Sequence, residues 1–224
     1  MKIRPFVSPA VAGCVIGLGL AAQASAANLV LNGSFEDTTA GSSSYNLTNA
    51  DFNALMNNAT AFGGGFDISG QGELDIESNP GTYAPDSGYG RWHVSLVQYD
   101  ALSLKLSESL VAGQEYQLTF VALSNTNFTA GTGPLRFGTS SSATDFGSLA
   151  FSTGAFSTVS QWQSFSTSFV ASSNSDFLTI QGSQGEGGAN SWMFVDGVSL
   201  QLVPTPGSLA LLGLGGLCLA RRRR

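Results

Sequence analysis

The chain has 224 residues, the length of one ordinary domain, and a net charge of −6 at neutral pH. Its basic residues lie mostly at the two ends of the sequence. Residues 27–202 therefore contain only Arg91, Lys105 and Arg136, together with all 15 acidic residues. Such an acidic region excludes nucleic-acid binding, which requires basic side chains against phosphates. No cysteine lies between Cys14 and Cys218, so disulfide bonds within residues 27–202 are also excluded.

The first 26 residues have the pattern of a secretory signal peptide. Lys2 and Arg4 form a basic start, residues 11–22 are apolar, and small residues precede the expected cleavage point. We therefore expect cleavage between Ala26 and Ala27, followed by export of the remaining chain.

Cys14 offers an alternative way of processing the same segment, because the residues before it resemble a lipobox and Cys14 would then carry a lipid. Pro9 interrupts the stretch before Cys14, and the longest apolar run follows it. These two features favour the signal peptide.

Residues 27–202 predict an antiparallel β-sandwich. This region is rich in Gly, Ser, Thr, Asn and Phe, and several stretches alternate apolar and polar residues, as half-buried strands do. The predicted strands are 28–32, 101–106, 116–122, 162–170, 177–180 and 194–202. Residues 51–60 predict one or two helical turns, and nothing else indicates a long helix.

A short acidic stretch, residues 73–77, alternates carboxylates with apolar side chains. On a strand, Glu73, Asp75 and Glu77 would share one face, opposite Leu74 and Ile76. This face is either a patch that attracts cations or a solvated strand edge whose charges prevent association with another edge.

Three aromatic residues lie close together in a segment rich in Gly, Pro and Ser. Tyr83, Tyr89 and Trp92 could form a platform for a sugar ring on an exposed loop, or they could pack structurally. The neighbouring His93 is the only histidine, which excludes a metal site built on several histidines. Because no nucleophile motif accompanies His93, we expect a protein that is not an enzyme.

The last 22 residues, 203–224, combine a break bounded by prolines, an apolar stretch and a basic end. The apolar stretch 209–220 is short, whereas a helix that spans the hydrocarbon core needs about 20 residues. Positive charges hold such a segment on the cytoplasmic side, and here they are Arg221, Arg222, Arg223 and Arg224. We expect a transient membrane signal rather than a permanent anchor.

This arrangement resembles the sorting tail of PEP-CTERM proteins. The family's Val-Pro-Glu-Pro signature reads here Val203, Pro204, Thr205 and Pro206, with threonine in place of glutamate. The resemblance implies two kinds of partner, the export machinery and a membrane-embedded protease of the exosortase type that cuts the tail.

Three further segments, 28–36, 112–120 and 194–200, resemble in chain order the galactose-binding-like domains of many carbohydrate-binding modules. The resemblance implies an antiparallel jelly-roll β-sandwich whose first and last strands lie close together. It also implies a structural Ca²⁺ with Glu36 and Asp196 as carboxylate ligands. Alternatively, both residues are turn acids that accept hydrogen bonds from neighbouring backbone amides.

The sequence thus predicts a signal peptide at 1–26, a β-sandwich domain at 27–202 and a sorting or anchor segment at 203–224. We expect an exported, non-catalytic protein of the cell surface or extracellular matrix, associated with exopolysaccharide or biofilm and anchored only transiently in the inner membrane. One alternative is a carbohydrate-binding module that acts on an extracellular glycan. A further alternative is an extracellular hydrolase.

Overall fold

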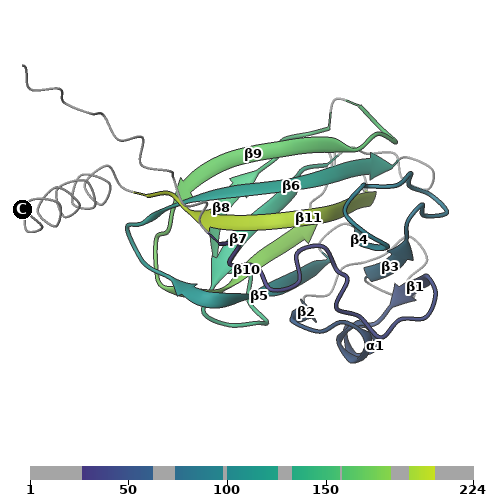
Figure 1. Ribbon diagram of the computed structural model, residues 1–224, viewed down its shortest axis with the longest axis horizontal. Helices are drawn as coiled ribbons and strands as arrows, with labels where there is room; N and C mark the ends of the chain where they lie inside the picture. The colour runs from purple at the N-terminus through teal and green to yellow at the C-terminus, as the bar shows by residue number, and fades with distance from the viewer. Residues whose placement is uncertain are drawn as a thin grey trace, which may run out of the picture. The chain divides into compact units, whose positions relative to one another are not determined.

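The described part of the chain forms two antiparallel β-sheets and one short helix, and alternating apolar and polar residues build the strands (Figure 1). The structure is a computed structural model that describes residues 27–62, 74–97, 100–125, 133–156, 158–182 and 192–204. These residues all belong to one compact unit, Ala26–Pro204.

One sheet has six strands and the other has five. The six-stranded sheet runs in the order β1 (Ser44–Leu47), β3 (Leu74–Ser78), β4 (Trp92–Val97), β11 (Trp192–Leu202), β6 (Glu115–Asn125) and β9 (Gln163–Val170). The five-stranded sheet runs in the order β2 (Ala59–Phe62), β5 (Ala101–Leu110), β10 (Ser175–Gly182), β7 (Leu135–Ser140) and β8 (Ser148–Ser152). Figure 1 shows β9, β6 and β11 as long neighbouring arrows.

The order of β4 to β11 is that of a jelly roll. Along the chain, β4 pairs with β11, β5 with β10, β6 with β9 and β7 with β8, as if one long hairpin were wrapped around a core. The outer pairs close only when distant parts of the chain meet. The predicted antiparallel jelly-roll β-sandwich is therefore confirmed.

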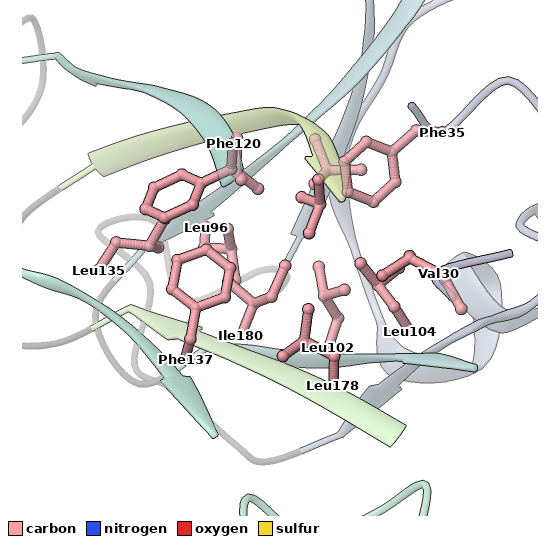
Figure 2. Close-up of a cluster of buried hydrophobic side chains, with 14 of the residues drawn as sticks. Val30, Phe35, Leu96, Leu102, Leu104, Phe120, Leu135, Phe137, Leu178 and Ile180 are labelled. Carbon is pink, nitrogen blue, oxygen red and sulfur yellow. The ribbon is translucent and has the colours of Figure 1, made fainter. Parts of the chain in front are cut away.

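The core lies between the two sheets and is apolar. Phe120 on β6 meets Phe137 on β7 with ring centroids 4.3 Å apart, and Phe120 stacks on Phe165 of β9 at 4.8 Å. Leu102 and Leu104 on β5 are fully buried in the same core (Figure 2), as the alternation of residues 101–106 predicted. This core fixes which face of each strand points outward.

The helix α1 (Asn49–Leu55) begins where its sequence provides a cap. The Thr48 side chain accepts a hydrogen bond from the Asp51 backbone N–H at 3.2 Å, and Phe52 is fully buried. The helix ends before residue 60, the predicted limit, because the chain continues into β2.

The segment 28–32 differs from its predicted strand: it forms an isolated bridge between Val30 and Leu106 and then turns. It still lies against β11, since the Val198 N–H donates to the Gly33 carbonyl at 2.8 Å. A Cβ on Gly33 would overlap the Val198 carbonyl, so the close approach requires glycine. The first and last segments of the domain are thus neighbours.

Candidate functional site

The candidate site lies on the outer face of the six-stranded sheet, the face that points away from the core. On β4, Val94 and Leu96 belong to the core, so the alternate residues His93 and Ser95 face outward. The same alternation places Asp75 and Glu77 of β3, and Trp192, Phe194 and Asp196 of β11, on the outer face. Titratable and aromatic side chains therefore share this face.

Residues 79–91, which we call the β3–β4 loop, carry the groups that pack on this face. Asn79 fastens the two ends of the loop, because its side-chain Nδ2 donates to the Ser87 hydroxyl at 3.0 Å and to the Gly90 carbonyl at 2.9 Å. At the loop's far end, Arg91 donates to the Gly41 carbonyl at 3.0 Å. Hydrogen bonds thus connect the two ends of the loop to each other and to the segment around Gly41.

Aromatic side chains from the loop and the sheet form a second apolar cluster, which we call the outer cluster. Its buried members are Ala84, Leu123, Trp192 and Phe194, and its half-buried members are Tyr83, Val97 and Trp162. The Tyr83 ring centroid lies 5.0 Å from that of Trp192. Trp162 donates from Nε1 to the Pro85 carbonyl at 2.7 Å, which connects the segment before β9 to the loop.

Glu77 and His93 are paired across β3 and β4 and are both 0 % exposed. The His93 ring also contacts the outer cluster, with centroids 5.5 Å from Trp162 and 5.7 Å from Phe194. Within the described residues, both Glu77 carboxyl oxygens and His93 Nε2 have no hydrogen-bond partner. Such orphaned polar atoms are rare in folded proteins.

The hydrogen bonds around Asn79 determine the tautomer of His93. Because Asn79 Nδ2 donates twice, its Oδ1 is the acceptor, and it lies 2.7 Å from His93 Nδ1. Nδ1 therefore carries the proton, and Nε2 is the bare nitrogen. A Cβ on Gly81 would lie 2.8 Å from Glu77 Oε2 and 3.1 Å from His93 Nε2, so both orphaned groups border one point beneath the loop.

Burial controls the charge of this pair. It raises the pKa of the Glu77 carboxyl to about 8, and the nearby Asp75 adds to the increase. It lowers the pKa of the His93 imidazole to about 4, although Asp86 acts in the opposite direction. At neutral pH both side chains are therefore uncharged. The expectation that the acidic stretch 73–77 is a solvated edge is wrong for Glu77, and Glu73 lies outside the described residues.

The structure brings Glu36 and Asp196 close together, as the resemblance implied for a Ca²⁺ site. Burial raises the pKa of Asp196 to about 7, and the charge of Glu36 contributes to the increase. The oxygens already accept hydrogen bonds: Glu36 Oε1 from the Trp92 N–H at 2.7 Å, Asp196 Oδ1 from the Gly197 N–H at 2.6 Å, and Asp196 Oδ2 from the Ser87 hydroxyl.

Across the described ranges, no three acidic, histidine or cysteine side chains group as a metal site. Two carboxylates fit a Ca²⁺ shell only together with several backbone carbonyls, since Ca²⁺ takes six to eight oxygen ligands. The pair is thus a possible part of a shell, and its oxygens also perform the hydrogen bonding expected of turn acids.

The three predicted sugar-contacting residues have different surroundings. Trp92 is 4 % exposed and packs in the core, so it has the structural role that the sequence left open and is not part of an exposed platform. Tyr83 is half-buried in the outer cluster. Tyr89 is 49 % exposed, and its ring lies against Gly197, where a Cβ would come within 2.6 Å of it.

Gly197 has the conformation that this contact requires. Its φ is 60°, in the left-handed region, and the β11–β6 register shifts between Asp196 and Ser199. The irregularity brings the Gly197 backbone to the Tyr89 ring and turns Asp196 toward the loop. The bulge could not be located from the sequence, although Asp196-Gly197 was a signal for a local turn.

The terminal sequence motifs lie largely beyond the described part of the chain. Ala27, Val203 and Pro204 are described, and the Val203 N–H donates to the Glu115 carbonyl at 2.9 Å. Ala26, Pro206 and the arginines 221–224 fall outside it, as does Cys14. None of the helical structure in the described ranges has the length and hydropathy that a membrane-spanning helix requires.

No protein-family model and no curated protein sequence matches this chain. Its fold is similar to that of a cyclase from Fischerella sp. TAU, with 14% identity and a TM-score of 0.54 over 81% of this chain and 99% of the cyclase. It is also similar to the K1 adhesin domain of Lys-gingipain from Porphyromonas gingivalis W83 (13% identity, TM-score 0.42, 66% of this chain, 92% of that domain). A third similar structure is the C-terminal family 6 carbohydrate-binding module of a marine laminarinase from Zobellia galactanivorans (12% identity, TM-score 0.35, 56% and 89%).

The cyclase corrects one prediction, namely that this chain is not an enzyme. The prediction depended on the lack of a catalytic motif around His93. An enzyme has the same sandwich along most of this chain, so neither the fold nor the missing motif argues against catalysis. Catalytic groups are recognised by their geometry, which sequence spacing does not reveal.

Proposed function

We propose that this chain is an exported protein of the cell surface or extracellular matrix that contacts a polysaccharide through its β3–β4 loop. The proposal of export depends on the signal-peptide pattern before Ala27 and on the tail after Val203, which resembles a PEP-CTERM sorting signal. In this proposal the export machinery and an exosortase-type protease are partners during secretion. The tail holds the chain in the inner membrane only until it is cut.

The observation that carries the polysaccharide contact is the placement of Tyr89. Its ring is about half exposed while it lies against the Gly197 backbone, so it offers a fixed aromatic surface. A tyrosine ring presents an apolar body and a polar hydroxyl, which suits the mixed surface of a sugar. Asp86 and Arg91, both exposed on the same loop, supply charged hydrogen-bonding groups nearby.

The hydrogen bonds of the loop support this role. Asn79 holds Ser87, two residues before Tyr89, and Gly90, the residue after it, and the Gly88 N–H donates to Asp86 at 2.8 Å. A loop that is already ordered loses little conformational entropy when a ligand binds. Binding residues are frequently found on such loops, held by a rigid scaffold.

We also propose that Glu36 and Asp196 hold a structural Ca²⁺. The ion would neutralise two neighbouring carboxylates, and backbone carbonyls would complete its shell. The ion would stabilise the contact between β11 and the first segment of the domain, residues 28–36.

Intact-mass analysis of the secreted product tests the proposal of export. The expected mass is that of a chain beginning at Ala27 and ending near Pro204. A full-length chain recovered from the cytoplasm, with Met1 and Arg224 in place, would overturn it.

Polysaccharide pull-down with the exopolysaccharide of the producing cells tests the contact. Tyr89→Ala should reduce binding by tenfold or more, while Leu149→Ala, a substitution of an exposed side chain on the other sheet, should leave binding unchanged. Equal binding by both variants would reject the loop as the contact. The recovered polysaccharide should also be sized, because shortened chains would indicate that the site acts on it chemically.

A further inference from the structure

The orphaned pair Glu77 and His93 has no role in the proposed polysaccharide contact. It lies under the β3–β4 loop, with Gly81 directly over both groups and Asn79 bonded to His93. A buried carboxyl group without hydrogen-bond donors is tolerated only while it remains uncharged. The loop therefore lies on the Glu77 carboxyl, and ionisation of this group would favour exposure of the sheet face beneath the loop to water.

We infer that the β3–β4 loop is a pH-sensitive cover, closed while Glu77 is protonated and opened when Glu77 ionises. Opening exposes the aromatic side chains of the outer cluster, Trp192 and Phe194, to solvent. The inference does not depend on polysaccharide binding, because it concerns only the loop and the face beneath it.

The groups around Glu77 make its ionised form costly. Asp75 neighbours it on β3, Asp86 lies on the loop near His93, and Asp196 of β11 faces the same loop with Glu36 beside it. All of these are acids, so an ionised Glu77 would meet more negative charge.

The nearest basic residue of the loop is directed elsewhere. The Arg91 guanidinium lies 4.5 Å from the Trp92 ring centroid and donates to the Gly41 carbonyl. His93 cannot compensate either, since its lowered pKa keeps it neutral wherever Glu77 is ionised. Hydration is the remaining way to stabilise the carboxylate.

Water reaches Glu77 most readily by movement of the loop. The strands on either side are held by the paired ladder of β3 and β4, from Leu74 opposite Leu96 to Ser78 opposite Trp92. The loop is held by the bonds of Asn79 and by contacts of Tyr83 and Ala84 with the outer cluster. Local opening of such a segment requires less free energy than opening of the sheet.

Hydrogen–deuterium exchange of the purified full chain at pH 6.0, 7.5 and 9.0 tests the inference, after correction for the intrinsic pH dependence of exchange. Peptides covering residues 79–91 should lose tenfold or more of their protection between the lowest and highest pH, while peptides from β6 keep theirs. Acrylamide quenching of tryptophan fluorescence should rise over the same interval, because Trp162 and Trp192 contact the loop region.

Glu77→Gln is the decisive variant, since the amide has the shape of the acid and cannot ionise. Its loop should remain protected at pH 9.0, whereas Glu108→Gln, a control at an exposed position on β5, should behave as the unmodified chain does. Unchanged protection of 79–91 in the unmodified chain overturns the inference whether or not Glu77→Gln folds. Loss of protection that includes β6, or an equal pH response in Glu77→Gln, also overturns it.

Discussion

The core and the outer cluster are built by the same strands from their opposite faces. β4 gives Val94 to the core and Val97 to the outer cluster, and β11 gives Val195 to the core and Phe194 to the outer cluster. The described core is apolar, whereas the outer cluster adjoins buried titratable groups with orphaned atoms. We therefore expect the core to determine stability and the outer cluster to respond to conditions.

The largest expected effect is in the core. Phe120→Ala removes a ring that contacts Phe137 and Phe165, and it should lower the free energy of unfolding by about 3–5 kcal/mol in urea denaturation. Val170→Ala, at an exposed position of β9, should change it by less than about 0.5 kcal/mol. A small loss for Phe120→Ala would mean that the rings are not well packed.

The pH dependence of the free energy of unfolding tests whether the groups beside the outer cluster respond to conditions. The pKa of Glu77 is about 8 in the folded chain and near its ordinary value when unfolded, so the folded state binds the extra proton and stability falls as pH rises toward 8. The pKa of His93 is lowered to about 4, so its contribution falls as pH drops from about 6.5 to 4 and opposes that of Glu77 there.

The loss of stability caused by ionisation of Glu77 should therefore be measurable above pH 6.5 by urea denaturation. Ionisation of Glu77 should account for about 2 kcal/mol of the difference in unfolding free energy between pH 6.5 and 8.5, at about 1.4 kcal/mol for each pKa unit crossed. Asp196, whose pKa is raised to about 7, should add a smaller loss over the same interval. Glu77→Gln should reduce this difference, and Glu108→Gln should preserve it. Stability that rises with pH over this interval would contradict the assigned protonation of Glu77.

Calcium should have a smaller effect that distinguishes the two readings of Glu36 and Asp196. If both bind Ca²⁺, a tenfold excess of the ion over its Kd raises the free energy of unfolding by about 1.4 kcal/mol, and chelator removes the gain. Melting curves with Ca²⁺ and with chelator measure it, and Asp196→Asn should abolish the difference. Identical curves for the unmodified chain would leave both residues as acceptors of backbone hydrogen bonds.

The smallest effect on stability, with a distinct effect on binding, is expected at Gly197. Gly197→Ala places a Cβ where the Tyr89 ring now lies, so the ring must move away. Since φ is also positive there, we expect a loss of about 1 kcal/mol together with weaker polysaccharide binding. Gly154→Ala is the matched control, because its φ is similar and the space beside it is open.

Much of the sandwich could be predicted from the sequence because period-two alternation survives where one strand face is buried. Residues 101–106 predicted β5 and its core leucines, and 194–202 predicted most of β11. Five of the described strands were missed: β1, β2, β4, β7 and β8. β2 falls partly in the range predicted to be helical, and β4 and β7 are buried on both faces, where alternation is a weak guide. β1 and β8 have few residues and little burial on either face. Their pairing is decided by neighbouring strands.

The candidate site was predicted only in part. The resemblance placed Glu36 near Asp196, and the composition of the loop drew attention to Tyr89. Alternation places Glu77 and Trp92 on opposite faces, but it does not reveal that the loop covers one face and the core buries the other. Burial of Glu77 depends on contacts between segments far apart in sequence, which local pattern does not encode.

The position of β11 between β4 and β6 has a consequence for the order of folding. The last of the described strands to be synthesised is a central one, so the six-stranded sheet stays divided until Leu202 has left the ribosome. Truncation of the chain before Trp192 should therefore separate β1, β3 and β4 from β6 and β9, because β11 is the strand hydrogen-bonded to both groups.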